Sequence, residues 1–310
     1  MAEKIALVGT GVIGRSWGIV FARAGYDVAY FDAADGVVAH ALGEVDKSLA
    51  DLERAEMIDG AAALRARMHP ASSLEEALDG VIYVQESVKE EVSIKHAVFS
   101  AMVAVAPDDA VLASSCSAIP PSKFLEVPTP HRCLIAHPIN PPHLVPCVEL
   151  VPSPWTDDAA MDRADEILSG AGQSSIRLTR EVEGFVVNRL QAAVMTEAVS
   201  LFARGIVSAE DIDKSMRDGL GLRWSFMGPL ETMDLNADAG FASYVEMYGK
   251  AITDMGQDLR VAEPWDEDVI KRIDSERRKL VPAESHAERR AWRDRRLIAL
   301  ARHKDSEDAG

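Results

Sequence analysis

The stretch KIALVGTGVIG, residues 4–14, decides the fold of the chain. A short apolar run passes through the pattern G-x-G-x-x-G into a helix-like segment, which predicts a strand, a tight turn and a helix. Gly9 permits the tight turn, Gly11 lets the backbone approach a pyrophosphate, and Gly14 allows the helix to pack closely on the strand. The stretch therefore predicts the first βαβ unit of a dinucleotide-binding domain.

The cofactor predicted from this unit is NAD. A second apolar run, residues 28–31, leads into Asp32, eighteen residues after Gly14. A carboxylate there accepts hydrogen bonds from the adenosine ribose diol and repels a 2′-phosphate, and no arginine follows it. The first helical turn, with Val12 and Ile13, is expected at the pyrophosphate. The alternative is an incidental glycine turn in another α/β fold. The position of Asp32 at the end of the next predicted strand, after the predicted helix, argues against it.

Apolar runs alternate with longer helix-like stretches over the first half of the chain. The predicted strands and helices are residues 5–8, 12–24, 28–31, 38–57, 81–84, 110–113 and 133–136. This alternation predicts an α/β fold with a parallel sheet covered on both faces. Beyond Thr179 the pattern changes to long 3.6-residue periods. We therefore predict a Rossmann-type NAD-binding domain over residues 1–182 and an all-α C-terminal domain over residues 183–310.

The composition is that of an ordinary globular protein, with 47% hydrophobic and 27% charged residues. No apolar run is long enough for a membrane span, and the N-terminus enters a strand pattern at once, without a signal peptide. Cys116, Cys133 and Cys147 form neither a disulfide framework nor a closely spaced zinc-binding pair. These features predict a cytoplasmic protein without a metal site. A net charge of −17 argues against nucleic acid as a partner.

Charge is distributed unevenly along the chain. Residues 271–304 carry twelve Lys or Arg against five Asp or Glu, whereas the remainder is strongly acidic. Trp292, Leu297, Ile298 and Leu300 give this segment an apolar side, which favours an amphipathic terminal helix with a solvated charged face. A positive surface that attracts an anionic substrate or another subunit is the alternative.

A second stretch, AHPINPPHLVPCVEL (residues 136–150), supplies candidate catalytic groups. Its prolines predict a rigid loop that is neither a helix nor a central strand. His137 ends an apolar run at the carboxyl edge of the predicted sheet, where ligands bind in open α/β folds, and histidine suits the base for alcohol oxidation. Glu149 is a carboxylate among apolar neighbours and needs a partner. It could fix the His137 tautomer, although a lone His and Glu more often form a structural pair.

These residues resemble the signature of the L-3-hydroxyacyl-CoA dehydrogenase family over nearly the whole chain. The matching positions are His137, Asn140-Pro141, Val148-Glu149 and Glu183-Gly184-Phe185-Val186-Val187-Asn188-Arg189-Leu190. The family has a proline where this chain has Glu183, which is a minor departure.

The resemblance implies a set of site residues. It implies that the catalytic residues are His137 as general base, Glu149, Ser117 and Asn188. Ser117 and Asn188 would also bind the reacting oxygen of the substrate. Glu90 and Lys95 would lie beside the nicotinamide half of NAD, whereas Cys116, next to Ser117, has no visible activating partner and is interpreted as inert packing.

Two segments, residues 137–152 and 223–236, resemble the lambda-crystallin and L-gulonate 3-dehydrogenase branch of the family. This implies NAD-dependent oxidation of the 3-hydroxyl of a small anionic L-3-hydroxy acid by a homodimer that associates through the helical domain. An L-3-hydroxyacyl-CoA substrate is the alternative, and a non-enzymatic, crystallin-like NADH-binding protein is a third possibility. Arg223 either binds a substrate carboxylate or forms a structural ion pair.

Overall fold

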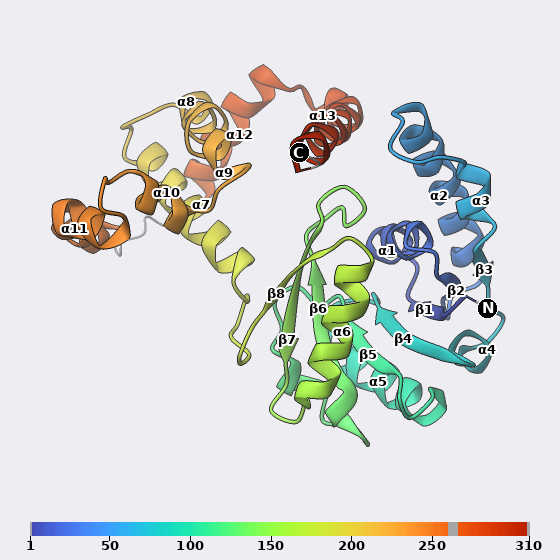
Figure 1. Ribbon diagram of the computed structural model, residues 1–310. Coiled ribbons are helices and arrows are strands. Elements are labelled where there is room, and N and C mark those ends of the chain that lie inside the picture. The colour runs from blue at the N-terminus through green and yellow to red at the C-terminus, as the bar shows by residue number, and fades with distance from the viewer. Residues whose placement is uncertain (1, 260–265, 309–310) are drawn as a thin grey trace. The chain divides into compact units, whose positions relative to one another are not determined.

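The computed structural model describes residues 2–259 and 266–308 (Figure 1). These residues group into two compact units. The first, which we call the sheet unit, contains the chain through Arg189 and again from Trp292 onward, and the second, the helical unit, is Leu190–Ala291. The sequence predicted one boundary at residue 183, so the grouping differs at both ends of the helical unit.

The sheet unit is built on a sheet that has eight strands in the order β3-β2-β1-β4-β5-β6-β7-β8 among the described residues. The strands are β1 (Lys4–Val8), β2 (Asp27–Phe31), β3 (Met68–Pro70), β4 (Val81–Glu86), β5 (Val111–Ser114), β6 (Cys133–Pro138), β7 (Cys147–Pro152) and β8 (Ser174–Arg177). Neighbouring strands are parallel except β6 and β7. The 3-2-1-4-5 order is Rossmann-type, which confirms the predicted α/β class.

Helices cover both faces of this sheet (Figure 1). They are α1 (Val12–Arg23), α2 (Val37–Arg54), α3 (Ala61–Arg65), α4 (Leu74–Leu78), α5 (Val92–Val105), η1 (Pro121–Lys123), η2 (Pro130–Arg132) and α6 (Asp158–Gly170). Alternate residues of β1 point to opposite faces, so Leu7 joins a core with α1, α2 and α6, whereas Ala6 joins a core with α4 and α5. Such two-sided burial explains why the central strands are continuously apolar.

The proline-rich stretch differs from its prediction as a loop. β6 continues through His137, and β7 includes Glu149, so only residues 139–146 form a loop between two interior strands. The prolines are compatible with the sheet because Pro138 is the last residue of β6 and Pro146 precedes β7. The antiparallel register places His137 directly opposite Glu149.

The described part of the helical unit contains helices and connecting segments, as predicted. The helices are α7 (Val187–Ala203), α8 (Ala209–Lys214), η3 (Ser215–Leu220), α9 (Gly221–Trp224), α10 (Pro229–Leu235), α11 (Phe241–Asp258), α12 (Glu267–Leu280), η4 (Ala283–Ser285) and α13 (His286–Asp308). α7 begins in the sheet unit, and α13 ends there. A search of the described helices finds none with the length and apolar character that crossing a membrane requires.

The terminal helix α13 has the predicted amphipathic pattern, but most of it belongs to the sheet unit. Leu297 and Ile298 pack against the core formed by α1, α2 and α6. Arg302 donates a 2.8 Å hydrogen bond to the carbonyl of Ala55, which caps the carboxyl end of α2, and lies 2.9 Å from Glu56. The predicted helical domain included this tail, whereas its apolar stripe packs within the sheet unit.

Candidate active site

The glycine turn leaves room for a ligand at the start of α1. Gly9 has φ +89°, and a Cβ there would lie 2.8 Å from the backbone of Ser87, while a Cβ on Gly14 would lie 2.1 Å from the Gly9 oxygen. By contrast, a Cβ on Gly11 would meet nothing within 4 Å. Gly11 caps α1 without a side chain, so the first-turn amides of Val12 and Ile13 face space suited to an anionic group.

Asp32 lies at the end of β2 beside this turn. Its Oδ2 accepts a 2.9 Å hydrogen bond from the amide of Thr10, and its Oδ1 accepts one of 3.1 Å from the amide of Ala34. Each carboxylate oxygen has further lone pairs, so Asp32 can still accept two ribose hydroxyls. The turn and this carboxylate together fit the pyrophosphate and adenosine ribose of NAD.

His137 and Glu149 form a buried pair on adjacent strands. His137 Nδ1 lies 2.8 Å from Glu149 Oε2, and the two side chains are 7% and 0% exposed. Burial acts to raise the pKa of Glu149, but hydrogen bonds from His137 and from the amides of Val187 and Val186 outweigh it, so the pKa is lowered. An ionised carboxylate only accepts hydrogen bonds, so the Nδ1 of His137 carries the proton and Nε2 is left as the acceptor.

The other predicted catalytic residues are joined to this pair by hydrogen bonds. The amide of Val187 donates to Glu149 Oε1 at 3.0 Å, and the next residue, Asn188, donates from Nδ2 to the carbonyl of Ser117 at 2.7 Å. The structure thus brings His137, Glu149, Asn188 and Ser117 into one connected group. The Ser117 hydroxyl and the second Asn188 amide hydrogen are suited to bind a substrate oxygen.

Glu90 supports the segment that carries Ser117. Its Oε1 accepts hydrogen bonds from the Cys116 thiol and from the amides of Ser117 and Ala118, at 3.1, 3.1 and 2.9 Å. These bonds outweigh burial and lower the pKa of Glu90. Burial, followed by the Glu90 bond, raises the pKa of the Cys116 thiol to about 12, which agrees with its interpretation as inert. Glu90 therefore orients the site, and a direct contact with NAD stays a prediction.

Lys95 differs from its prediction as a cofactor ligand. Its side chain is 1% exposed, and Nζ lies 2.9 Å from both carboxylate oxygens of Glu86 and 3.2 Å from Ser114 Oγ. These three oxygens match the three hydrogens of the ammonium group, which leaves no donor for a ligand. Glu86 also accepts the amide of Val88 at 2.6 Å. Lys95 therefore fixes the ends of β4 and β5 from within the core.

A second polar cluster beneath the site was not predicted. Gln85, which is fully buried, donates from Nε2 to Ser115 Oγ at 2.7 Å and to the carbonyl of Ala136 at 3.1 Å. Ser115 Oγ also accepts from Trp17 Nε1 at 3.2 Å and lies 2.8 Å from Ser87 Oγ. The cluster connects α1 and the loop after β4 with the residue that precedes His137. The available signal was a glutamine inside the apolar strand VIYVQE.

Arg223 and His143 are not part of the connected group. Arg223 lies in α9 of the helical unit and is exposed, so its role stays a prediction. His143, in the loop between β6 and β7, lines a pocket of about 330 Å³ with the ends of α1 and α6. Burial lowers the pKa of His143 to about 4, which makes it a poor base at neutral pH.

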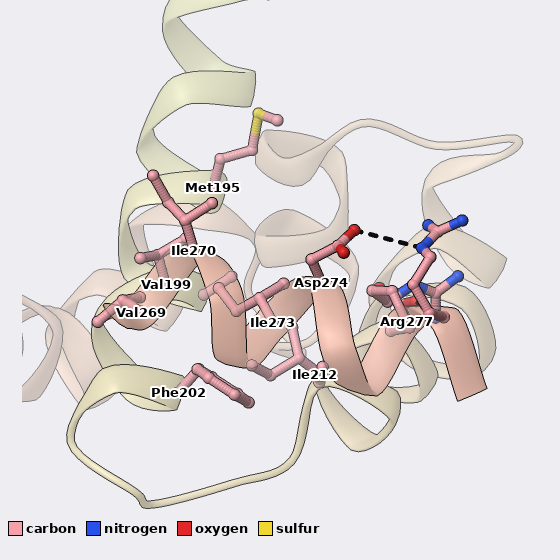
Figure 2. Close-up of a pocket in the computed structure, with 13 residues that line it drawn as sticks. Met195, Val199, Phe202, Ile212, Val269, Ile270, Ile273, Asp274 and Arg277 are labelled. Atoms are coloured by element: carbon pink, nitrogen blue, oxygen red, sulfur yellow. Dashed lines mark hydrogen bonds and ion pairs between the residues drawn. The ribbon is translucent and has the colours of Figure 1, made fainter. Parts of the chain in front are cut away.

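A pocket of about 440 Å³ lies in the helical unit (Figure 2). α7, α8 and α12 supply its walls, which are mainly apolar and include Met195, Val199, Phe202 and Ile273. The described lining contains none of the predicted catalytic residues. Across the described chain, no group of three or more His, Cys, Asp or Glu could hold a metal ion.

Hydride transfer from an alcohol to NAD requires that the dinucleotide site and the base lie close together, as they do when both are at the same edge of a sheet. Because β1 and β6 run in the same direction, Gly9 and His137 follow or end strands at one carboxyl edge of the sheet. These features define an NAD-dependent dehydrogenase.

The chain belongs to the 3-hydroxyacyl-CoA dehydrogenase family and is an NAD-dependent oxidoreductase. The family's NAD binding domain matches residues 4–182, and its C-terminal domain matches residues 184–279. The chain is 41% identical over 306 residues to the lambda-crystallin homolog of Bos taurus, covering 97% of this chain and 95% of that protein. It is 37% identical over 253 residues to L-carnitine dehydrogenase of Streptomyces griseus, covering 81% and 75%.

The fold is similar to a solved structure of 5-formyl-3-hydroxy-2-methylpyridine 4-carboxylic acid 5-dehydrogenase. The TM-score is 0.83 with 24% sequence identity, and the match covers 97% of this chain and 98% of that one. The matches to the family end at residue 279, so all of α13 (His286–Asp308) lies beyond them.

Proposed function

We propose that the protein oxidises the 3-hydroxyl of a small, free L-3-hydroxy carboxylic acid, such as L-gulonate, with NAD. The buried hydrogen bond between His137 and Glu149 carries this proposal, because it leaves the Nε2 of His137 as a base. Similarity to L-carnitine dehydrogenase, which is named for a free hydroxy acid, supports such a substrate rather than a thioester.

The proposed reaction removes a proton and a hydride from the same alcohol. Bound NAD supplies the hydride acceptor for C3 of the substrate. His137 Nε2 accepts the hydroxyl proton, and Glu149 stabilises the resulting imidazolium. Ser117 and Asn188 bind the reacting oxygen and orient C3. Arg223 is proposed to pair with the substrate carboxylate, since a guanidinium can grip it with two parallel hydrogen bonds.

Replacing the proposed base tests the reaction directly. His137→Gln is expected to lower kcat at least about 100-fold, since general bases contribute 10²–10⁴-fold, while NADH affinity changes little. NADH formation is followed by absorbance and NADH binding by fluorescence titration. If His137→Gln keeps most of the activity, His137 is not the base.

A substrate panel separates the alternatives. Free L-3-hydroxy acids, including L-gulonate, L-carnitine and L-3-hydroxybutyrate, are compared with 3-hydroxyacyl-CoA thioesters by kcat/KM. A clear preference for thioesters favours an L-3-hydroxyacyl-CoA dehydrogenase, the second candidate, which the family name supports. NADH binding without turnover of any member favours a crystallin-like binding protein.

We propose that the protein is a homodimer that associates through the helical unit. Apolar side chains there expose more than half of their surface, including Leu222, Phe226, Leu230, Leu235, Met247 and Met255. Apolar surface of this extent commonly marks an interface between proteins. Sedimentation over a range of concentrations tests the proposal, and a monomer at every concentration contradicts it.

A further inference from the structure

The carboxylate of Glu149 binds two different partners with its two oxygens. Oε2 lies 2.8 Å from His137 Nδ1, whereas Oε1 accepts the amide of Val186 at 2.7 Å and that of Val187 at 3.0 Å. α7 begins at Val187, so Oε1 lies at the amino end of this helix, where the helix dipole is positive. One carboxylate oxygen therefore bonds to the imidazole, and the other bonds to the backbone at the start of α7.

The backbone before α7 is turned to make these two bonds. Gly184 has φ +73° and Phe185 has φ +52°, so two successive residues are left-handed, and the second is not a glycine. A non-glycine residue in this region costs conformational free energy and persists only when its surroundings hold it there. Phe185 is fully buried, and its ring centroid lies 5.6 Å from that of His137. The packed ring holds the turn that directs the next two amides at Glu149.

We infer that the start of α7 is a positioning element of the catalytic pair, and that the amides of Val186, just before the helix, and Val187, its first residue, limit how strongly Glu149 holds a proton on His137. Hydrogen bonds from the two amides stabilise the negative charge of the Glu149 carboxylate. Donors at Oε1 therefore weaken the electrostatic attraction between this carboxylate and the imidazolium of His137. This role rests on the proposed function, because it concerns the base of that reaction. α7 continues into the helical unit, and the amide of its first residue donates a hydrogen bond to Glu149.

The other charged and titratable groups near Glu149 are neutral or pair with other residues. On β7, the pKa of the Cys147 thiol is raised by burial and then by the charge of Glu149, so the thiol stays neutral. On β8, the residue opposite Glu149 is Ile176, and the next one, Arg177, forms ion pairs with Asp158 and Asp162. On α7, Arg189 donates to the carbonyl of Glu183. His137 is the titratable group that bonds directly to the carboxylate.

The first test removes one amide from the full-length protein. Val187→Pro deletes the N–H that bonds Oε1 at the first position of α7, where proline is tolerated, and Val187→Ala keeps that N–H. In Val187→Pro, the acidic limb of the kcat/KM profile for alcohol oxidation is expected to move to higher pH by about half to one unit relative to Val187→Ala, because the proton on His137 is held more strongly. Equal midpoints in the two variants overturn the inference.

The same shift is measurable without turnover. The pH titration of the His137 ring resonances by NMR, assigned by their loss in His137→Gln, is expected to move in the same direction in Val187→Pro. If the wild-type protein oxidises none of the proposed substrates, the proposed function fails while this titration still decides the inference. An unchanged titration midpoint overturns the inference even where the enzyme is active.

A second pair of variants applies if Val187→Pro does not fold. Gly184→Ala and Gly205→Ala each force an alanine into a left-handed conformation, at φ +73° and φ +68°, without a new contact closer than 3.6 Å. Both changes impose similar backbone strain, but only Gly184 lies in the turn before α7. Gly184→Ala is expected to shift the acidic limb, and Gly205→Ala to leave it at the wild-type pH. The inference is overturned if both variants keep the wild-type limb.

Discussion

The sheet unit and the helical unit differ in what they bury and what they expose. The sheet unit holds polar side chains with at most 1% exposure, each hydrogen-bonded within the unit, including Gln85, Glu86, Lys95 and Glu149. In the helical unit, the buried apolar cluster among the described residues consists of Val199, Phe202, Ala209 and Val269. Phe226 and Leu230 of that unit are 69% and 67% exposed.

This difference indicates which unit can hold buried charged residues of a catalytic site. A charge is buried at tolerable cost only where the surrounding core supplies its partners, and the sheet unit provides such a core. The proposed catalytic residues lie in this unit, and they include Asn188 from a segment that the sequence assigned to the second domain. Exposed apolar surface such as that of the helical unit commonly marks an interface between proteins, which supports the proposed homodimer.

The largest expected effect tests the interior of the sheet unit. Lys95→Met removes one partner of a fully buried ion pair and leaves Glu86 uncompensated, which is expected to lower the free energy of unfolding by about 3–5 kcal/mol. Urea denaturation measures the loss. Lys89→Met, which breaks the exposed pair with Glu91, is the control and is expected to change the stability far less than Lys95→Met does.

The double variant Glu86→Gln/Lys95→Met sharpens this result. It removes both charges, so the loss is expected to be smaller than in Lys95→Met alone. A single-variant loss no larger than that of Lys89→Met would show that the sheet unit does not depend on this buried pair.

A smaller effect concerns His143, whose lowered pKa makes stability depend on pH. The pKa falls from 6.5 to about 4 on folding, mainly because of burial, so the unfolded chain takes up a proton first as the pH decreases. Stability is therefore lost between pH 6.5 and about 4, by at most about 3 kcal/mol at 1.36 kcal/mol per pKa unit. The pKa values of Glu90 and Glu149 are lowered by folding, so these carboxylates lose their stabilising contributions as the pH falls below the usual glutamate pKa of 4.5.

Two variants isolate the His143 contribution. His143→Leu and His143→Asn both remove the titrating ring, and urea midpoints measured from pH 7 to pH 4.5 are expected to vary less with pH than in the wild-type protein. The asparagine variant keeps a polar side chain, which separates titration from polarity. A wild-type slope in both variants would assign the pH dependence to other groups.

Five interior strands were predictable, whereas the interior strand β7 and the two edge strands were not; the prolines around β7 predicted a loop. β1, β2, β4, β5 and β6 carry consecutive buried apolar residues, because helices cover both faces of the sheet. β3 and β8 lie at the two edges of the sheet and expose residues such as His69 and Arg177, so they lack an apolar run. A pattern based on burial therefore detects a strand only where both of its faces are covered.

The sequence supplied the proposed catalytic residues, but it did not supply the connections between them. The pairing of His137 with Glu149 depends on the register across the loop of residues 139–146, which spacing alone does not determine. Lys95 was assigned to the cofactor because of its motif position, and only the fold shows that it turns inward to Glu86. The bonds from Val186 and Val187 to Glu149 use backbone amides, which every residue type provides and no motif can single out.

The smallest expected effect tests whether the terminal helix belongs to the sheet unit. Arg302→Ala removes a cap on the last turn of α2 and an exposed ion pair with Glu56, which together are expected to stabilise the sheet unit by about 1 kcal/mol. Arg217→Ala is the matched control in the helical unit, because Arg217 pairs with the exposed Asp218, so its effect on stability is expected to be smaller than that of Arg302→Ala. Amide hydrogen exchange in the last turn of α2 is expected to accelerate in Arg302→Ala alone. Equal exchange rates in both variants would mean that α13 does not pack against α2 in solution and is not part of the sheet unit.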